Sequence, residues 1–346
     1  MPQTLTIDAS GMTGKSFKQN TYFEEFFEGL TYDDNTFYGG TPDSAFGGTY
    51  YVNGSEVVNR YTDGTDPVEQ ALILEGTEIA YDFIHHGAEF GHGISGEVTG
   101  LVFGRWMDGT TSGTEGTGDA GRVSGFNENV VIDGLDVSAA PGSGNEPGEN
   151  AVNTVYSAAQ DMDASVFTAL FADYALEVTG TRRNDRLEGS DHDDVLIGGA
   201  GGDTLARSSG DDIMIGGRGD DLVLGGGGSD TLAVGAGDDV LKGGRGRDTI
   251  TGGAGDDTLV GGPGFDTLTG GAGADTFVIL AGAKGEKITD FDVDADVLDV
   301  TDLGLSSLDD FTVIERDSKI VLVDDNVRIH LIGVEADDLT SDHFIF

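Results

Sequence analysis

One aspartate recurs at every ninth residue through the second half of the chain, and this period limits the possible fold more than any other feature. The in-phase aspartates run from Asp185 to Asp275, and an apolar residue follows each by two positions, from Leu187 to Phe277. Glycine pairs fill the intervals, as in GGAGDDTLV and GGRGRDTIT. The 58 glycines among 346 residues could also belong to a disordered linker. Because eleven aspartates keep one phase, we instead expect a chain wound into equal turns.

The nonapeptide combines the groups that a calcium site requires. Glycine lets the backbone adopt positive φ and turn its carbonyl oxygens inward. Aspartate adds a carboxylate, and Ca²⁺ prefers carboxylate and carbonyl oxygens as ligands. The pattern G-G-x-G-x-D-x-U-x, in which U is a large apolar residue, resembles the repeat of RTX calcium-binding proteins.

The resemblance implies an all-β parallel β-roll over residues 179–278, with a calcium ion between stacked turns. Each repeat then directs one apolar residue into a core too thin to fold unaided, so we expect metal binding and folding to be coupled. Roughly eight to ten ions could be held in this way. The candidate calcium ligands are Asp194, Asp203, Asp212, Asp221, Asp230, Asp239, Asp248, Asp257, Asp266 and Asp275.

The repeat is degraded at three places. The segment ARSSGDDIM lacks the glycine pair, and His192 and Val234 each replace a glycine. A side chain at such a position restricts the backbone conformations that turn carbonyl oxygens inward. We expect these turns to bind calcium weakly or not at all.

The charge balance is extreme and excludes several classes of partner. The chain has 63 acidic and 18 basic residues, a formal net charge of −45. Nucleic acid and anionic membrane surfaces are therefore not expected as partners. The absence of cysteine excludes disulfides and thiolate metal sites. No apolar run approaches the roughly 18 residues of a membrane span, so none is predicted.

Residues 279–346 resemble the C-terminal flank of RTX proteins, a β-rich cap on the open end of the roll. Their last residues, DDLTSDHFIF, resemble an uncleaved type I secretion signal. The N-terminal residues lack the charged and apolar regions of a cleaved signal peptide. The resemblance implies an extracellular protein exported by the type I secretion machinery, with association to the cell surface left open.

Residues 1–178 lack the repeat and alternate helical and strand patterns. Apolar residues recur at helical spacing within 16–30 and 165–176, and a further helix is predicted at 151–160. Strand-like runs separated by turn-rich segments lie between them. We expect an α+β domain, in which helices accompany an antiparallel sheet.

No enzyme signature is present, and no enzymatic activity is predicted. The chain has neither the H-E-x-x-H zinc motif nor the G-x-S-x-G nucleophile elbow. His85 and His86 are adjacent, so within one strand their side chains point to opposite faces. A zinc site built on this pair is therefore not expected.

The segment IAYDFIHHGAEFGHG contains Tyr81 near the end of a predicted strand and three of the six histidines in the following loop. A loop that folds back would bring a histidine near the Tyr81 hydroxyl. Free tyrosine has a pKa near ~10, and a neighbouring imidazole helps to keep it deprotonated at neutral pH. Tyrosinate is a ligand of ferric haem iron in proteins.

The first half is similar to the HasA-type haemophores, secreted proteins that capture haem for Gram-negative bacteria. The likeness runs from Leu5 to Val178 and includes FYGG at 37–40, FGG at 46–48, HGISGEVTGLVFG at 92–104 and the closing segment 155–178. It implies that Tyr81 is an axial ligand of ferric protoporphyrin IX and that His92 hydrogen-bonds to Tyr81. It also implies host haemoproteins and an outer-membrane haemophore receptor as partners.

One departure from that family concerns the second axial ligand. Many members supply a histidine from the loop after the first helix, whereas no histidine precedes His85 here. Tyr32 or Tyr38 could contribute, or Tyr81 could be the single strong protein ligand; His85 or His86 could take the role of His92. The predicted function is a secreted haem-capturing protein with a calcium-dependent tail. The alternative is a calcium-dependent surface or adhesion protein that does not bind haem.

Overall fold

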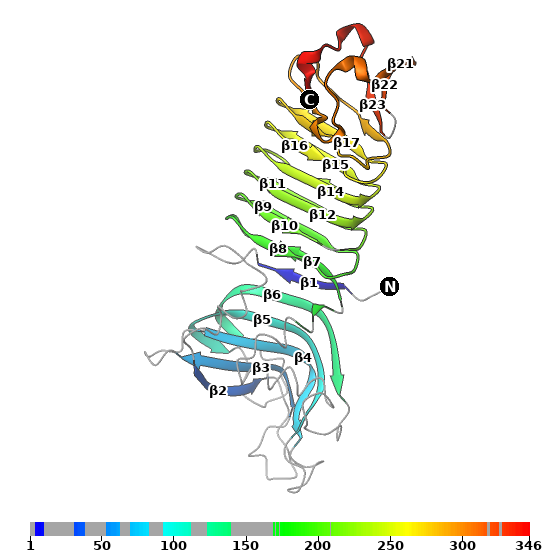
Figure 1. The fold of residues 1–346 in the computed structure, drawn as a ribbon. Helices are drawn as coiled ribbons and strands as arrows, with labels where there is room; N and C mark the ends of the chain where they lie inside the picture. The colour runs from blue at the N-terminus through cyan, green and yellow to red at the C-terminus, as the bar shows by residue number, and fades with distance from the viewer. Residues whose placement is uncertain are drawn as a thin grey trace, which may run out of the picture. The chain divides into compact units, whose positions relative to one another are not determined.

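The computed structural model describes residues 4–9, 31–38, 53–62, 70–82, 93–111, 123–139, 169, 171–172, 174–207, 209–316, 319–324 and 327–346. The chain divides into two compact units, which comprise mainly residues 20–174 and 175–346 (Figure 1). Among the described residues, none of the helices has the length and apolar character that a membrane span requires.

The first unit contains an antiparallel sheet. Its strands lie in the order β2-β3-β4-β5-β6-β1, so consecutive strands are neighbours from β2 to β6 and the first strand pairs with the sixth. The helices expected at 16–30 and 151–160 lie outside the described residues, and the α+β class stays a prediction. The strand bounds are Thr4–Asp8 for β1, Thr31–Tyr38 for β2, Asn53–Thr62 for β3, Gln70–Asp82 for β4, Gly93–Thr111 for β5 and Val123–Ala139 for β6.

The helix expected over 165–176 does not extend to its predicted end. Strand β7 (Ala175–Thr179) begins within that segment. Leu176 is buried, and its N–H donates to Asp194 Oδ1 at 2.6 Å. Pairing of β7 with β9 and this side-chain bond therefore override the helical spacing of the apolar residues at the end of the segment.

The second unit is a parallel β-solenoid of about seven turns, and each turn contributes one strand to each of two sheets (Figure 1). Strands one turn apart stack in register, so Met214 lies beside Leu232 and Leu232 beside Ile250. The first sheet contains β7, β9 (Val195–Ala200), β11 (Ile213–Arg218), β13 (Thr231–Ala233), β15 (Thr249–Ala254), β17 (Thr267–Ala272) and β19 (Glu286–Ile288). The second contains β8 (Arg186–Glu188), β10 (Thr204–Ala206), β12 (Leu222–Gly228), β14 (Val240–Gly246), β16 (Thr258–Val260), β18 (Thr276–Val278) and β20 (Val297–Asp299).

The apolar residue of each nonapeptide forms the core between the two sheets. Because strand side chains alternate between faces, the central residue of each short strand points inward and its neighbours point outward. All of these apolar residues have 0% exposure, as predicted for the β-roll: Leu187, Leu196, Leu205, Met214, Val223, Leu232, Leu241, Ile250, Leu259, Leu268 and Phe277.

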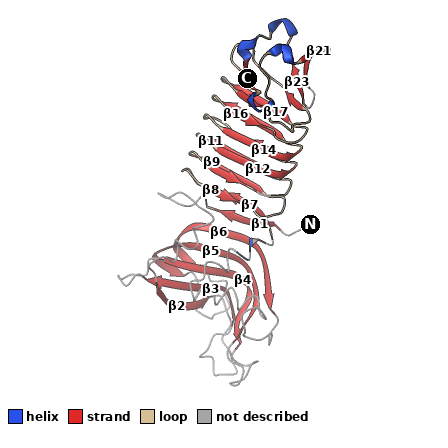
Figure 2. Ribbon diagram, in the orientation of Figure 1, coloured by secondary structure: helices blue, strands red, loops and turns tan. Residues whose placement is uncertain are grey.

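The C-terminal segment adds strands and short helices to the last turns (Figure 2). Strands β21 (Thr312–Arg316), β22 (Lys319–Val323) and β23 (Arg328–Ile332) form an antiparallel meander, and β23 pairs in parallel with β19. Strand β24 (Phe344–Ile345) pairs with β20, so the end of the chain belongs to the folded sheet. The 3-10 helices are η2 (Thr301–Leu303), η3 (Leu308–Asp310), η4 (Ala336–Asp338) and η5 (Ser341–His343).

Candidate metal centre: two aspartate ladders

The in-phase aspartates form two separate stacks, because one turn of the roll takes two nonapeptides. Residues 18 positions apart therefore lie directly above one another. We call the stack of Asp185, Asp203, Asp221, Asp239, Asp257 and Asp275 the first ladder, and that of Asp194, Asp212, Asp230, Asp248 and Asp266 the second ladder. All eleven side chains are buried, with exposures of 0–3%.

From Asp203 to Asp275, the neighbouring turn holds one oxygen of each ladder carboxylate. The N–H of Asp203 donates to Asp221 Oδ1 at 2.7 Å, and the same bond recurs along both ladders at 2.7–3.0 Å. These bonds fix the orientation of each carboxylate and leave its second oxygen to face the interior of the turn.

In most turns that second oxygen has no partner. A buried polar atom without a hydrogen bond is costly, and a buried carboxylate requires a compensating positive charge. Stacked carboxylates of this kind therefore fit a ladder of cations. Within the described part of the chain, the buried Oδ2 atoms that accept no hydrogen bond belong to Asp203, Asp221, Asp230, Asp239, Asp248, Asp257, Asp266 and Asp275.

In the intact repeats, the glycine five residues before the aspartate makes room for these oxygens. A Cβ at Gly198 would lie 2.5 Å from Asp203 Oδ2 and 2.6 Å from the carbonyl oxygen of Gly216. At Gly225 the corresponding distances are 2.6 Å to Asp230 Oδ2 and 2.5 Å to a carbonyl oxygen of the next turn. The missing side chain thus brings one carboxylate oxygen and one carbonyl oxygen together, the two ligand types that calcium prefers.

Burial raises the pKa of many of the ladder carboxylates. It raises the pKa of Asp203 and Asp257 to about 7 and that of Asp221 and Asp248 to about 6, with neighbouring ladder carboxylates acting in the same direction and backbone N–H donors opposing them. An isolated ladder therefore favours either protonation or a bound cation at neutral pH.

Both ladders extend past the nonapeptides. Glu286 is fully buried above Asp266 in the second ladder, and burial raises its pKa to about 8. Neither of its carboxylate oxygens has a hydrogen-bond partner among the described residues. In the first ladder, the Asp275 N–H donates to Asp296 Oδ1 at 2.9 Å.

The nine-residue period does not reveal Glu286 and Asp296, because they follow their ladder neighbours by 20 and 21 residues instead of 18. A local signal was nevertheless present. Each is an acid followed at the second position by an apolar residue, Ile288 or Leu298, as in the repeat itself.

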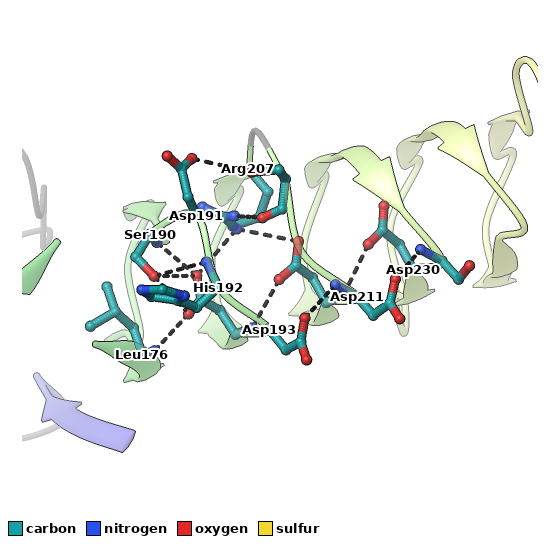
Figure 3. A network of polar contacts seen from close by, with 12 residues as sticks. Leu176, Ser190, Asp191, His192, Asp193, Arg207, Asp211 and Asp230 are labelled. Atoms are coloured by element: carbon teal, nitrogen blue, oxygen red, sulfur yellow. Dashed lines mark hydrogen bonds and ion pairs between the residues drawn. The ribbon is translucent and has the colours of Figure 1, made fainter. Parts of the chain in front are cut away.

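At the N-terminal end of the roll, protein groups satisfy the carboxylates. The N–H of Thr181 donates to Asp185 Oδ2 at 2.5 Å, and its hydroxyl contacts the same oxygen at 2.8 Å. The N–H of Ser190 donates to Asp194 Oδ2 at 2.7 Å (Figure 3). Both residues lie four positions before their aspartate, where the intact repeats have the second glycine of the pair.

Backbone oxygens must complete any metal site in the roll. Among the described residues, no group of three or more His, Asp or Glu side chains lies in a metal-binding cluster. A site between two turns would therefore use two carboxylates and the carbonyl oxygens beside them. At the degraded turn of Val234, Asp239 Oδ2 still lacks a partner, so the carboxylate arrangement is retained there.

Among the residues predicted to bind haem, Tyr81 belongs to the antiparallel pair of β4 and β5. Tyr81 lies in β4 opposite Ile94, and Asp82 lies opposite Gly93. The backbone of Tyr81 is described but its side chain is not, and His92, His85 and His86 lie outside the described residues. Tyr32 and Tyr38 are in β2, where the description is also of the backbone.

Comparisons with known proteins identify the repeats. Residues 177–205, 208–241, 224–259, 233–268 and 251–283 match the family model of the RTX calcium-binding nonapeptide repeat. No curated protein matches the chain.

Three solved structures illustrate the similarity of the chain to known folds. The extracellular lipase LipA from Serratia marcescens is 21% identical with a TM-score of 0.28, and the match covers 50% of this chain and 40% of the lipase. The holo hemophore HasA from Yersinia pestis is 15% identical with a TM-score of 0.34, covering 48% of this chain and 87% of HasA. The AlgE6R2 subunit of the Azotobacter vinelandii mannuronan C5-epimerase is 25% identical with a TM-score of 0.26, and the match covers 46% of this chain and 92% of the subunit. The family match establishes that residues 177–283 of this chain carry RTX calcium-binding repeats.

Proposed function

We propose that the chain is an extracellular protein whose C-terminal unit folds when calcium enters the two ladders. The observation that carries this proposal is the stack of eight buried carboxylate oxygens without hydrogen-bond partners among the described residues. When bound, calcium would supply the positive charge that these oxygens require. The carboxylates of the ladders, with Glu286 at one end, are the proposed side-chain ligands.

The net charge of −45 adds to the need for a cation. Mutual repulsion of the carboxylates opposes a compact roll until they are neutralised. Extracellular modules bind calcium with dissociation constants of about 10⁻⁴ to 10⁻³ M, whereas cytosolic sensors respond to far lower concentrations. The roll would therefore stay unfolded inside the cell, in a form suited to the type I secretion machinery, and fold outside it.

Circular dichroism of the full chain tests the calcium proposal. We expect a large gain of β signal when chelator is replaced by millimolar calcium chloride, and a smaller response to magnesium because its octahedral geometry fits these sites poorly. An unchanged spectrum in chelator and calcium would overturn the proposal.

We further propose that the N-terminal unit captures ferric haem through Tyr81, with His92 as the partner of the phenolate. The similarity of residues 5–178 to the HasA-type haemophores supports this function. The strand register supports it as well, because Asp82 pairs with Gly93, the residue that directly follows His92 in the chain. Tyr81 therefore lies next to the end of β4, and His92 is the last residue of the sequence segment that connects β4 to β5. Bound haem would supply a ferric iron, for which an anionic phenolate oxygen is a suitable ligand.

Titration of the full chain with hemin tests haem capture. We expect a saturable change in the Soret and charge-transfer bands in calcium-containing buffer. If no saturable spectrum appears while calcium still folds the roll, the alternative function applies: a calcium-dependent surface or adhesion protein without haem.

A further inference from the structure

The turn that lacks its glycine pair has an arginine where the intact repeats have their first glycine. The sequence of this turn is RSSGDD over residues 207–212, and Arg207 replaces the first glycine. Its Nε lies 3.2 Å from Asp194 Oδ2 and 3.3 Å from Asp212 Oδ2. The arginine side chain is 1% exposed and both carboxylates are 0% exposed, so this is a buried cation between two rungs of the second ladder (Figure 3).

Comparison with the other rungs shows what Arg207 replaces. Further along the same ladder, the Oδ2 atoms of Asp230, Asp248 and Asp266 have no hydrogen-bond partner among the described residues. The Oδ2 atoms of Asp194 and Asp212 face the Arg207 guanidinium instead. One positive group of the protein itself thus lies beside two carboxylate oxygens whose counterparts further along the ladder have no partner among the described residues.

The space around Gly189 supports the same conclusion. In the equivalent environment of Gly198, the two nearest groups are a ladder carboxylate and the carbonyl oxygen of the next turn. At Gly189 they are the Asp194 carboxylate and the Arg207 side chain, whose Nε would lie 2.7 Å from a Cβ at that glycine. The arginine side chain therefore occupies the space beside the Asp194 carboxylate.

The guanidinium is also anchored within its own turn. Its Nη2 donates to the Ser209 carbonyl oxygen, so the head group binds acceptors from both rungs and from the loop between them. Guanidinium is protonated at every physiological pH and is planar, which suits a buried position between two carboxylates. Unlike a calcium ion, it cannot dissociate from the chain.

We propose that Arg207 is a built-in cation that replaces one calcium ion between Asp194 and Asp212, so that the first turn of the roll is ordered without calcium. This inference rests on the proposed calcium-dependent folding of the remaining turns. Thr181 and Ser190 cap the neighbouring carboxylates with protein donors, so the whole N-terminal turn is satisfied by the chain itself. The calcium-dependent turns then stack on this ordered turn, so they do not have to nucleate the roll themselves.

Counting bound ions tests the replacement directly. The variant with both Arg207→Gly and Ser208→Gly restores the glycine pair, and native mass spectrometry of the full chain at saturating calcium gives the stoichiometry. We expect the variant to bind one more calcium ion than the parent. The control is Arg245→Gly, which removes the same charge from an exposed position of the same ladder and should leave the count unchanged.

An equal count in the parent and in the double variant would overturn the inference, because calcium would then bind beside Arg207 or displace it. If the parent binds no calcium at all, the proposed function fails instead. The two failures are therefore distinguishable in one experiment.

Hydrogen exchange in chelator provides a second measurement that does not require a new calcium site. In the parent, the N–H of Asp194, which donates to Asp212 Oδ1 at 2.8 Å, should exchange at least about tenfold more slowly than that of Asp230, which donates to Asp248 Oδ1 at 2.9 Å. Arg207→Gln should abolish this difference, while Arg245→Gln should preserve it. Calcium-loaded spectra of each variant check that it folds. Equal protection of Asp194 in Arg207→Gln and the parent would contradict the inference.

Discussion

Asp239 uses its two carboxylate oxygens differently. Oδ1 accepts the Asp221 N–H at 2.7 Å, whereas Oδ2 is buried without a partner among the described residues. Asp239→Asn preserves the shape and the accepting oxygen but removes a charge shared by two adjacent sites. We expect the calcium concentration at half-folding, measured by circular dichroism, to rise roughly tenfold. Asp238→Asn, at the exposed neighbouring position, should change it much less, and equal shifts in the two variants would argue against Asp239 as a ligand.

The raised pKa values of the buried carboxylates predict that protonation can partly replace calcium in stabilising the roll. In an unfolded chain these groups titrate near pH ~4, whereas burial raises the pKa of Asp203 to about 7 and that of Glu286 to about 8. Since the folded pKa is the higher one, the stability they contribute is complete below about pH 4 and is lost as the pH rises through 6–8. In chelator, the β signal should therefore increase when the pH falls from 8 to 5. Glu286→Gln should weaken the part of this change nearest pH 8; a signal that falls on acidification would contradict the prediction.

Tyr81→Phe tests the haem ligand at the level of one oxygen atom. Without the phenolate, we expect most of the hemin affinity to be lost and the charge-transfer bands to change. His92→Ala should weaken binding less, with a loss that grows as the pH falls because protonation then competes for the phenolate. Tyr32→Phe and Tyr38→Phe are the matched controls. If one of them abolishes binding while Tyr81→Phe binds like the parent, the ligand assignment is wrong.

The individual turns show how far a sequence period can predict a structure. Leu187 to Phe277 could be assigned to the core because an unbroken spacing fixes both the turn length and the inward face. Glu286 and Asp296 could not be assigned in this way, because longer loops change the number of residues between neighbouring ladder positions while the stacking continues. The sequence shows that Arg207 departs from the glycine pattern, but its role depends on distances to carboxylates of two ladder rungs, Asp194 and Asp212, which no local pattern contains. The end of the predicted helix at Leu176 was wrong for a similar reason, since a strand partner about 20 residues away decides the conformation.

The two units of the molecule should respond differently to calcium. The first-unit sheet pairs antiparallel strands whose segments contain no nonapeptide, whereas the second unit depends on the ladders. A fragment of residues 1–178 should therefore unfold in one cooperative thermal transition in chelator, with the same midpoint after calcium is added. A midpoint that rises with calcium would show that the first unit also binds the ion. An aggregated fragment would contradict the predicted boundary.

Because successive nonapeptides alternate between the two sheets, the number of repeats determines the side of the roll on which the C-terminal strands lie. Strand β23 stacks on β19 in one sheet, and β24 stacks on β20 in the other, so the C-terminal strands distinguish the two faces of the roll. Removing one nonapeptide would send every later strand to the opposite sheet and rotate the C-terminal end by half a turn about the long axis. Removing two would shorten the roll and leave its facing unchanged. The parity of the repeat count, and not merely its size, therefore sets the side of the roll on which the C-terminal end is presented.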